Sequence, residues 1–277
     1  MKVSNRFRAS KDVRLTESAA GDTPLRDDRK GKLKNGELKE KERAQTAELS
    51  GELSKLQEKL YASKNRKLLI ILQGMDTAGK DGTVRALFSQ LNPMGLDATG
   101  FVAPTERERA HDFLWRVHPH VPGNGMIAIW NRSHYEDVLV PRVNGDLDDE
   151  AVKRRYAQIR DFERLLHETG TTIVKLFLHI SKDEQKARLQ ARLDDPEKYW
   201  KFDPNDLAVR AKWEAYQRAY EDAIVATNVD HAPWYVIPSD SKTHRNLITA
   251  HILLETVQDM DLGWPAPKAD LAKVTID

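Results

Sequence analysis

Cysteine is absent from the 277-residue sequence. Without thiols the chain has no disulfide framework, no thiol nucleophile and no cysteine-based zinc site, so redox chemistry is excluded as its function. Also missing are an apolar run of the roughly 18 residues that a membrane helix needs and, at the N-terminus, the apolar core of a signal peptide. We therefore expect a cytoplasmic protein with no membrane partner.

An excess of charge of one sign is lacking too, because 44 Lys and Arg residues stand against 43 Asp and Glu residues. A protein that coats nucleic acid shows a broad basic excess, and a single-strand binder interleaves aromatic residues with a basic stripe. Aromatic residues amount to 7% and follow no such stripe. We expect no nucleic-acid partner, and any site for a polyanion must be a local concentration of charge.

The first 66 residues divide into two parts. Residues 1–36 mix charged residues and glycine without periodicity, most irregularly from Gly21 to Gly36, and predict an arm without a role in the core. Residues 37–66 predict a helical extension, because leucines recur on one face of an amphipathic helix between 37 and 61. This helix could pack on its own core or on a neighbouring chain.

Residues 67–265 predict the main domain, and residues 266–277 a tail. Short apolar runs, which are typical of buried strands, alternate here with helical patterns. The runs lie at 67–72, 98–102, 126–130, 173–179 and 234–237, and the helical patterns at 83–91, 151–168 and 246–259. This alternation predicts an α/β fold of three layers, α/β/α, around a parallel sheet.

A long charged insertion interrupts this alternation between Ser181 and about Thr227. It is rich in helical pattern but contains a break at Asp194-Asp-Pro-Glu-Lys198. Insertions of this length in a compact domain are often functional, and they frequently close over a substrate. We predict a mobile helical lid, with residues 181–210 as its main part.

The first apolar run leads directly into a glycine-rich loop that satisfies G-x-x-x-x-G-K. In the order strand, loop and helix, backbone N–H groups turn around phosphate oxygens and the helix adds its positive dipole end, whereas a chance glycine turn would lack this context. Lys80 would supply a mobile positive charge. We expect phosphate or nucleotide contacts from Gly74, Thr77, Ala78, Gly79, Lys80, Asp81, Gly82 and Thr83.

Two acidic residues depart from the common form of this loop. Asp76 lies inside the loop, where a carboxylate repels phosphate unless a divalent cation lies between them. Asp76 is therefore the first candidate for a magnesium ligand, and a solvent-facing turn residue is the alternative. Asp81 stands where a Ser or Thr commonly follows the lysine, and it could simply complement the helix dipole.

A second polar cluster, Asn131 to Asp137, follows the run at 126–130. It therefore lies at the carboxyl end of a strand, where ligands bind in open α/β sheets. Arg132 suits a phosphate clamp because its guanidinium is always protonated and fork-shaped. Glu136 and Asp137 could hold a metal or contact an acceptor nucleotide. His134, beside a tyrosine, fits a packing residue better than a base.

In the predicted lid, Arg188 and Arg192 share one helix face because they are four residues apart. Phosphoryl transfer needs cations around the dispersed charge of the transferred group, and a lid arginine is a common source. We predict a catalytic Arg188 and a phosphate-binding Arg192, against the alternative of a solvated helix face. A chain-like polyanion also needs a basic track that leads to the site. The Lys and Arg residues of the lid are its expected source, without a choice among them, and these include Lys182, Lys186, Lys198 and Lys201.

Three motifs together resemble polyphosphate kinase family 2: Gly74-x-Asp76-x-Ala78-Gly79-Lys80-Asp81-Gly82, the segment Asn131 to Asp137, and Ser181-Lys-Asp-Glu-Gln185. The resemblance extends from about Lys55 to Glu255. It implies a thymidylate-kinase-like P-loop fold with a lid, and phosphoryl transfer between inorganic polyphosphate and nucleoside mono- or diphosphates with Mg²⁺, or Mn²⁺ in its place. It also implies a homo-oligomer, a dimer or a tetramer.

The same resemblance places Asp76 and Lys80 at the catalytic centre, Arg132 on phosphate and Arg188 in the lid. The first subgroup of the family carries Asp-Arg-Ser-Trp-Tyr where this chain has Asn131-Arg-Ser-His-Tyr135, which resembles the third subgroup, whose members phosphorylate both AMP and ADP. GMP and GDP are further candidate acceptors. A neutral amide binds magnesium weakly, so Asp137 is predicted to replace the missing charge as a second metal ligand.

Two other functions are compatible with parts of this pattern. An ATP-dependent nucleoside monophosphate kinase would use the same strand, loop and lid, and only the donor distinguishes it. A noncatalytic polyanion-binding protein on a decayed P-loop is the alternative of another class, but Lys80 and the acidic metal candidate Asp76 are both intact. Magnesium-dependent turnover separates an enzyme from a binding protein, whose affinity would only respond to salt.

Overall fold

A parallel sheet forms the centre of the molecule in the computed structural model, which describes residues 2–26, 34–267 and 276. In these residues the strand order is β2-β3-β1-β4-β5, and each neighbouring pair is parallel. The strands are β1 (Lys67–Gln73), β2 (Leu96–Gly100), β3 (Ile127–Asn131), β4 (Thr171–His179) and β5 (Trp234–Pro238). The predicted parallel α/β fold is confirmed.

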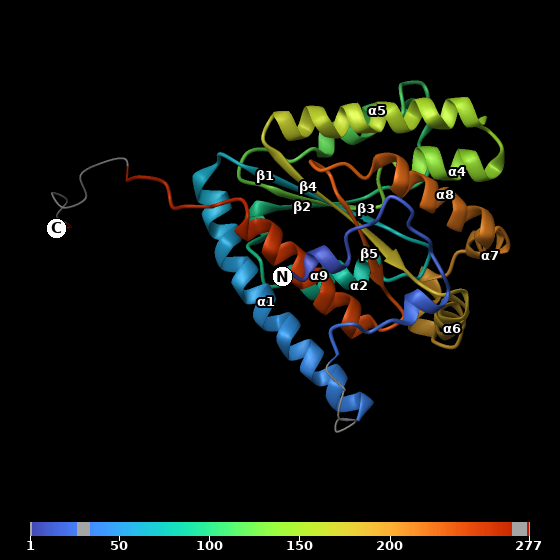
Figure 1. Cartoon of the computed structure of the whole chain (residues 1–277), viewed down its shortest axis with the longest axis horizontal. Helices are drawn as coiled ribbons and strands as arrows, with labels where there is room; N and C mark the ends of the chain where they lie inside the picture. The colour runs from blue at the N-terminus through green and yellow to red at the C-terminus, as the bar shows by residue number, and fades with distance from the viewer. Residues whose placement is uncertain (1, 27–33, 268–275, 277) are drawn as a thin grey trace.

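Helices cover both faces of the sheet (Figure 1). One layer contains α1 (Asn35–Ser63), α2 (Lys80–Phe88) and α9 (Lys242–Gln258), and the other contains α4 (Glu136–Asn144), α5 (Asp149–Glu168) and α8 (Trp213–Thr227). Further short helices are α3 (Glu106–Arg109) and the 3₁₀ helices η1 (Ser4–Arg6), η2 (Ser18–Gly21), η3 (Pro93–Gly95) and η4 (Trp115–His120). The long helix α1 packs on α9 of its own chain.

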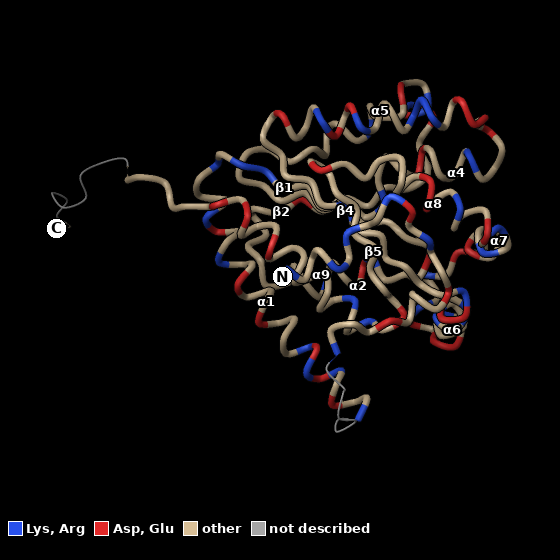
Figure 2. The backbone as a smooth tube through the Cα atoms, in the orientation of Figure 1, with Lys and Arg blue, Asp and Glu red and all other residues tan. Residues whose placement is uncertain are grey.

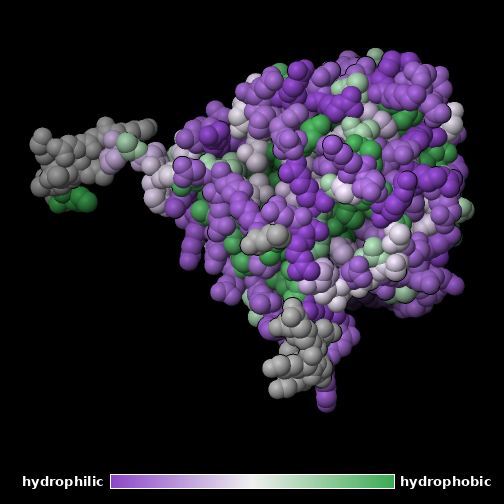
Figure 3. Space-filling model, in the orientation of Figure 1, coloured by the Kyte–Doolittle hydropathy of each residue, from purple (hydrophilic) through white to green (hydrophobic). Residues whose placement is uncertain are grey.

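The burial of the strands and the hydrophilic surface both agree with this layered arrangement. Strands β1, β3 and β4 are buried along almost their whole length, as their runs of Leu, Ile and Val require in a sheet covered on both faces. On the face of the molecule in Figure 3, hydrophilic residues predominate and hydrophobic ones show only in small areas. Among the described residues, no helix is long and apolar enough to cross a membrane.

Element boundaries differ from the predicted ones mainly beside the ligand-binding edge. The helix predicted at 83–91 is α2, which begins three residues earlier at Lys80, because Gly79 in the left-handed region turns the chain directly into the helix. The strand predicted at 98–102 is β2, which ends at Gly100, paired with Asn131, and leaves Val102 70% exposed.

The prediction that the arm has no role in the core is wrong for its described part. Phe7, Leu15 and Ala20 are buried, and the backbone of Phe7 to Ala9 pairs with the free edge of β5 through Ala9 N–Trp234 O and Val236 N–Phe7 O, both 2.8 Å. A strand edge offers unpaired N–H and C=O groups, and the arm satisfies them. The apolar residues of the arm are irregularly spaced, so a search for periodic patterns does not detect this role. Residues 27–33 of the arm, and 268–275 and 277 of the tail, lie outside the described residues.

The charged insertion contains two different parts. Helix α6 (Lys182–Leu193), the 3₁₀ helix η5 (Pro196–Lys201) and α7 (Asn205–Ala211) lie beyond the carboxyl end of β4, and we call residues 181–210 the lid segment. Charged residues are dense on α6 and α7, whereas the strands carry few (Figure 2). Helix α8 was predicted within the insertion, but it belongs to the core, since Trp213, Tyr220 and Ile224 on it are buried.

Candidate active site

The glycine-rich loop between β1 and α2 lies at the carboxyl edge of the sheet and depends on its two glycines. Gly74 and Gly79 have φ angles of +149° and +105°. A Cβ atom on Gly74 would lie 2.6 Å from the carbonyl oxygen of Leu178, and one on Gly79 would lie 1.8 Å from Nη1 of Arg245. A side chain at either position would collide with the carbonyl of Leu178 or with the guanidinium of Arg245, so glycine is required at both. With these two glycines the loop has the geometry of a phosphate cradle.

Lys80 turns back over this loop. Its Nζ donates hydrogen bonds to the carbonyl oxygens of Gly74 at 2.7 Å and Met75 at 3.3 Å. Burial lowers the pKa of the ammonium, and the nearby positive charge of Arg132 lowers it further. The neighbouring carboxylates of Asp76 and Glu136 oppose this decrease. A bound phosphate would add negative charge at the same place and so stabilise the protonated form.

Arg132 and Asp76 join the end of β3 to the loop. Nη2 of Arg132 donates to Oδ1 of Asp76 at 2.7 Å, and the backbone of Arg132 is left-handed, with φ of +63°. Burial opposes the guanidinium charge, but Glu136 and Asp76 raise the pKa of Arg132 above its ordinary value. Burial raises the pKa of Glu136, whose carboxylate accepts a hydrogen bond from Gln73 Nε2 at 3.0 Å.

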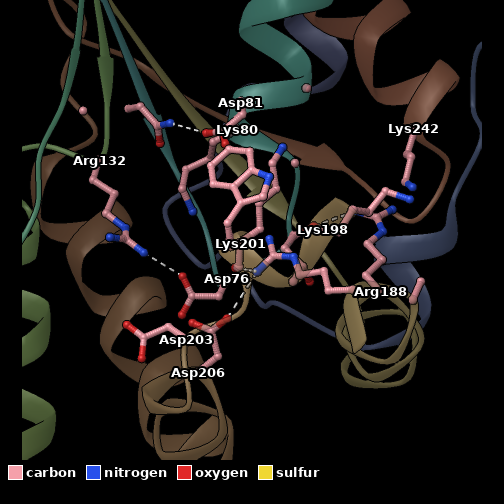
Figure 4. A pocket seen from close by; sticks show the side chains of 18 of the residues that line it. Asp76, Lys80, Asp81, Arg132, Arg188, Lys198, Lys201, Asp203, Asp206 and Lys242 are labelled. Atoms are coloured by element: carbon pink, nitrogen blue, oxygen red, sulfur yellow. Dashed lines mark hydrogen bonds and ion pairs between the residues drawn. The ribbon is translucent and has the colours of Figure 1, made fainter. Parts of the chain in front are cut away.

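These groups open into a cavity of about 750 Å³ (Figure 4). Of the predicted site residues, ten line it: Asp76, Thr77, Gly79, Lys80, Asp81, Gly82, Asn131, Arg132, Arg188 and Arg192. Gly74, Ala78, Thr83 and Asp137 are not among its lining residues. The sequence motifs around Gly79 and Asn131 therefore meet at one site, although about 50 residues separate them.

Asp137 lies away from this cavity. Its Oδ2 accepts hydrogen bonds from Nε and Nη2 of Arg116, at 3.0 and 2.9 Å. Burial raises the pKa of Asp137 and the charge of Arg116 opposes the rise. The geometry does not support our prediction of Asp137 as a metal ligand, because its carboxylate is used by Arg116. Asn131, in contrast, lines the cavity, and its Nδ2 donates to Oδ1 of Asp81 at 2.6 Å.

Arg188 lines the cavity, but every N–H donor of its guanidinium has a protein acceptor. Nε donates to Glu184, Nη1 to the carbonyl oxygens of Thr77 and Ala78, and Nη2 to those of Ser239 and Asp240, at 2.7 to 3.3 Å. The prediction was a lid arginine that contacts the transferred group. In this structure Arg188 instead braces the glycine-rich loop against the segment after β5.

Two cations on α9 are functional candidates that the sequence analysis missed. Lys242 and Arg245 line the cavity, and Arg245 Nη1 donates to the carbonyl oxygen of Ala78 at 2.9 Å. Burial, with the charge of Arg188, lowers the pKa of Arg245 to about 9. The sequence around Lys242 and Arg245 has the pattern of an ordinary buried helix, so it does not mark these two cations as functional. The signal that could have found them is position, since α9 begins just after the carboxyl end of β5.

The lid segment supplies charges of both signs. Lys198 and Lys201 of η5 line the cavity, and so do Asp203 and Asp206, which the sequence analysis also missed. Arg192 Nη1 donates to the carbonyl oxygen of Lys201 at 2.7 Å and lies 3.3 Å from Oδ2 of Asp206. Burial, and next the charge of Asp76, raise the pKa of Asp206 to about 6.

The acidic side chains of the cavity suit magnesium better than they suit a metal whose ligands all come from the protein. Within the described ranges, no group of three or more His, Asp or Glu side chains is arranged to hold a metal ion. Magnesium typically takes one or two carboxylates and completes its shell with water and substrate phosphates. Asp76 is the carboxylate that lies in the glycine-rich loop itself, and it is directed into the cavity (Figure 4).

Comparisons with known proteins agree with this site. The family described as "Polyphosphate kinase 2 (PPK2)" matches residues 37–263. An AMP/ADP-polyphosphate phosphotransferase of Meiothermus ruber is 51% identical over 83% of this chain and 86% of its own length. An ADP-polyphosphate phosphotransferase of Rhodopseudomonas palustris is 44% identical, over 77% and 78%.

A solved structure leads to the same family. The crystal structure of polyphosphate kinase 2 from Arthrobacter aurescens superposes with a TM-score of 0.89 at 42% identity, over 98% of this chain and 94% of that one. With the glycine-rich loop, the cationic cavity and the parallel sheet in the arrangement described above, the chain belongs to the polyphosphate kinase 2 family.

Proposed function

We propose that this enzyme transfers phosphoryl groups reversibly from inorganic polyphosphate to AMP and to ADP. The observation that carries the proposal is the cavity, in which the glycine-rich loop is surrounded by basic side chains from three separate elements: Lys80 of α2, Lys198 and Lys201 of η5, and Lys242 and Arg245 of α9. This concentration of positive charge, in a chain of net charge +1, suits two polyanionic substrates at once.

The two substrates would occupy different parts of the cavity. In Figure 4, Lys242 and Arg188 lie on the opposite side from Arg132. We assign the polyphosphate chain to the side of Lys242, Lys198 and Lys201, because polyphosphate is bound through its charge and needs no apolar contact. The acceptor nucleotide belongs to the side of Arg132 and the end of β2, where Val102, which is 70% exposed, offers apolar surface to a nucleobase.

The chemistry requires alignment and charge neutralisation. An oxygen of the acceptor's terminal phosphate attacks the end phosphorus of polyphosphate in line, the new P–O bond forms, and the bridging P–O bond to the shortened chain breaks. The attacking oxygen is already ionised near neutral pH, so no general base is needed. Backbone N–H groups of the glycine-rich loop, with Lys80 and Arg132, would neutralise charge on the equatorial oxygens.

Asp76 would hold magnesium, with Mn²⁺ as a substitute, and this ion would neutralise phosphate oxygens as a Lewis acid. With Asp76 on the ion, the guanidinium of Arg132 would be available to a phosphate. This exchange explains how an arginine and a carboxylate that pair with each other at 2.7 Å can both serve the reaction.

The likeness to the AMP/ADP-polyphosphate phosphotransferase, together with Asn131 and His134 in the second motif, supports acceptance of both AMP and ADP. GMP and GDP are further candidate acceptors. The family likeness supports a homo-oligomer, dimer or tetramer, and the nucleotide substrates support a cytoplasmic location. Sedimentation measures the oligomeric state directly.

The experiment that tests the proposal is a donor exchange. Purified protein receives magnesium and AMP with polyphosphate or, separately, with ATP, and chromatography follows ADP and ATP. Turnover with polyphosphate supports the proposal. Turnover with ATP and none with polyphosphate overturns it in favour of a nucleoside monophosphate kinase, and binding without turnover favours a noncatalytic protein.

A further inference from the structure

We propose that Glu17, in the N-terminal arm, is a positioning residue that fixes both ends of the lid segment and so sets the place of its phosphate-binding cations. The proposal rests on the proposed function, since it takes the lid segment to carry groups that bind polyphosphate. Glu17 lies outside residues 37–263, which match the family, and it does not line the cavity. Any effect on the reaction is therefore exerted through other residues.

One carboxylate makes both contacts. Oε2 of Glu17 accepts a hydrogen bond at 2.7 Å from the backbone N–H of Lys182, the first residue of α6. Oε1 accepts one at 2.8 Å from Nε1 of Trp213, the first residue of α8. Between these two residues the chain forms α6, η5 and α7. Glu17 therefore joins the point where the lid segment departs to the point where it returns.

The point of return is fixed in the core. Trp213 is 1% exposed and belongs to the main hydrophobic cluster. The lid segment, in contrast, has large apolar side chains in solvent, with Trp200 78% and Leu207 54% exposed. The region of η5 therefore gains little of its stability from packing, whereas α6 is anchored by Leu189, which is 4% exposed, and by Arg188. Contacts at the two ends add to those of α6 in holding the lid segment.

Neighbouring residues of the arm extend this connection to the glycine-rich loop. The carbonyl oxygen of Ala20 accepts from the N–H of Asp240 at 3.1 Å, and Oδ1 of Asp240 accepts from the N–H of Ser181 at 2.9 Å. The carbonyl oxygen of Asp240 in turn accepts from Arg188, which also holds the carbonyl of Thr77. In Figure 1 the arm, in dark blue, reaches the start of α6 before it turns back toward α1.

A carboxylate suits this role because both donors are N–H groups and one belongs to the first turn of a helix, where negative charge is favoured. The Glu17 side chain is itself exposed, so its replacement leaves no buried cavity. The expected consequence is a lid segment that samples wider positions, with its cations Arg192, Lys198 and Lys201 less often in place. Misplacement of positioning groups by about 1 Å is sufficient to lower a rate substantially.

The test compares three single variants and one double variant with the unmodified full chain. Glu17→Gln keeps the shape but has only one acceptor oxygen for two donors, and Trp213→Phe removes one donor while a smaller aromatic ring remains in the core. Glu255→Gln is the matched control, because Glu255 also fastens the arm, through the N–H groups of Val3 and Ser4, but to α9 and far from the lid segment in the sequence. Each variant is checked for an unchanged unfolding temperature of the core by calorimetry.

Two readouts are measured well below the unfolding temperature. We expect Glu17→Gln to lower kcat/KM for polyphosphate by about tenfold and to accelerate tryptic cleavage after Lys198 and Lys201 by a similar factor. Trp213→Phe should shift both in the same direction, and adding it to Glu17→Gln should change little more, since both remove one contact. Glu255→Gln should remain within about twofold of the unmodified chain in both.

The proposal is overturned if Glu17→Gln leaves both readouts unchanged, or if Glu255→Gln reproduces its effects, which would mean that any loosening of the arm suffices. The proteolysis readout needs no substrate. If the chain shows no turnover with polyphosphate, the proposed function fails on that result, whereas the positioning role of Glu17 stands or falls on the cleavage of the lid segment.

Discussion

Arg132 Nη2 lies 2.7 Å from Asp76 Oδ1, so the end of β3 is tied to the glycine-rich loop by an ion pair at the position where we expect phosphate and magnesium. The side chain of Arg132 is about one third exposed and that of Asp76 less than one fifth, which leaves both accessible from the cavity. We expect the substrates to replace this pair with contacts of their own.

Replacement of Arg132 by lysine tests this exchange. Lysine keeps the charge but loses the fork that binds two phosphate oxygens, so we expect kcat to fall by about 100-fold with an unchanged fold. Steady-state kinetics with polyphosphate and ADP, beside circular dichroism, measure both. Arg142→Lys is the control, since Arg142 pairs with Asp222 outside the cavity and its replacement should change kcat by less than about twofold. Equal losses in both variants would contradict a special role for Arg132.

Replacement of Gly79 by alanine should damage loop and activity together. Its φ of +105° is unfavourable for alanine, and the new Cβ would collide with Arg245 Nη1 at 1.8 Å. We expect a loss of about 1–3 kcal/mol in the free energy of unfolding, and loss of turnover because Arg245 must move. Gly36→Ala, in helix α1 with open space around it, should be neutral or stabilising. Urea titrations compare the two, and an unaffected Gly79→Ala would refute the described loop.

Asp206→Asn should tighten polyphosphate binding in a pH-dependent way. The pKa of Asp206 is raised to about 6, so its carboxylate is charged above pH 6 and repels a polyanion in the same cavity. We expect the KM of the unmodified chain for polyphosphate to exceed that of the variant by about threefold at pH 8, and the difference to disappear near pH 5, where Asp206 is protonated. A KM ratio that does not vary between these pH values would contradict the prediction.

The same pKa has a consequence for folding. Because the folded pKa lies above the ordinary value of 3.8, the group favours folding below about pH 4, and this contribution is lost as pH rises through 6. The unmodified chain should therefore lose unfolding free energy, relative to Asp206→Asn, between pH 4 and pH 6. Denaturant titrations of both proteins across this range measure the difference.

Lys175 and Glu163 form an ion pair at 2.6 Å between β4 and α5, and both side chains are fully buried. Lys175→Met would leave a carboxylate buried without its cation, so we expect a loss of about 3–5 kcal/mol in the free energy of unfolding. Lys153→Met removes the partner of an exposed pair with Glu150 and should leave the free energy of unfolding almost unchanged, because solvent screens such a pair. Similar losses in the two variants would show that burial of the Lys175 pair has no such consequence.

The sequence predicted well those parts of the site whose position follows from the local order of strand, loop and helix along the chain. The loop at Gly79 and the cluster at Asn131 each follow an apolar run, and parallel strands bring such segments to one edge. Arg188 and Arg192 line the same cavity, as their i and i+4 spacing requires. The spacing could not reveal that the guanidinium of Arg188 donates its hydrogen bonds to carbonyl oxygens of segments distant in the sequence.

The failures have a common physical origin in long-range contacts. Glu136 and Asp137 are adjacent on a helix, so their side chains point about 100° apart. Glu136 lies beside Gln73 and Asp137 faces Arg116, a partner that no local pattern indicates. The arm packs along β5 through isolated apolar residues and backbone pairing, which leave no periodic signal in the sequence.

The most direct measurement of the central claim is ATP formation by purified protein supplied with polyphosphate, magnesium and either AMP or ADP, with Lys80→Ala and Asp76→Asn as comparison variants. The structure predicts ATP from both acceptors and its loss in both variants, because Lys80 and Asp76 meet at the glycine-rich loop. Absence of product from polyphosphate, or full activity in the two variants, would contradict the account.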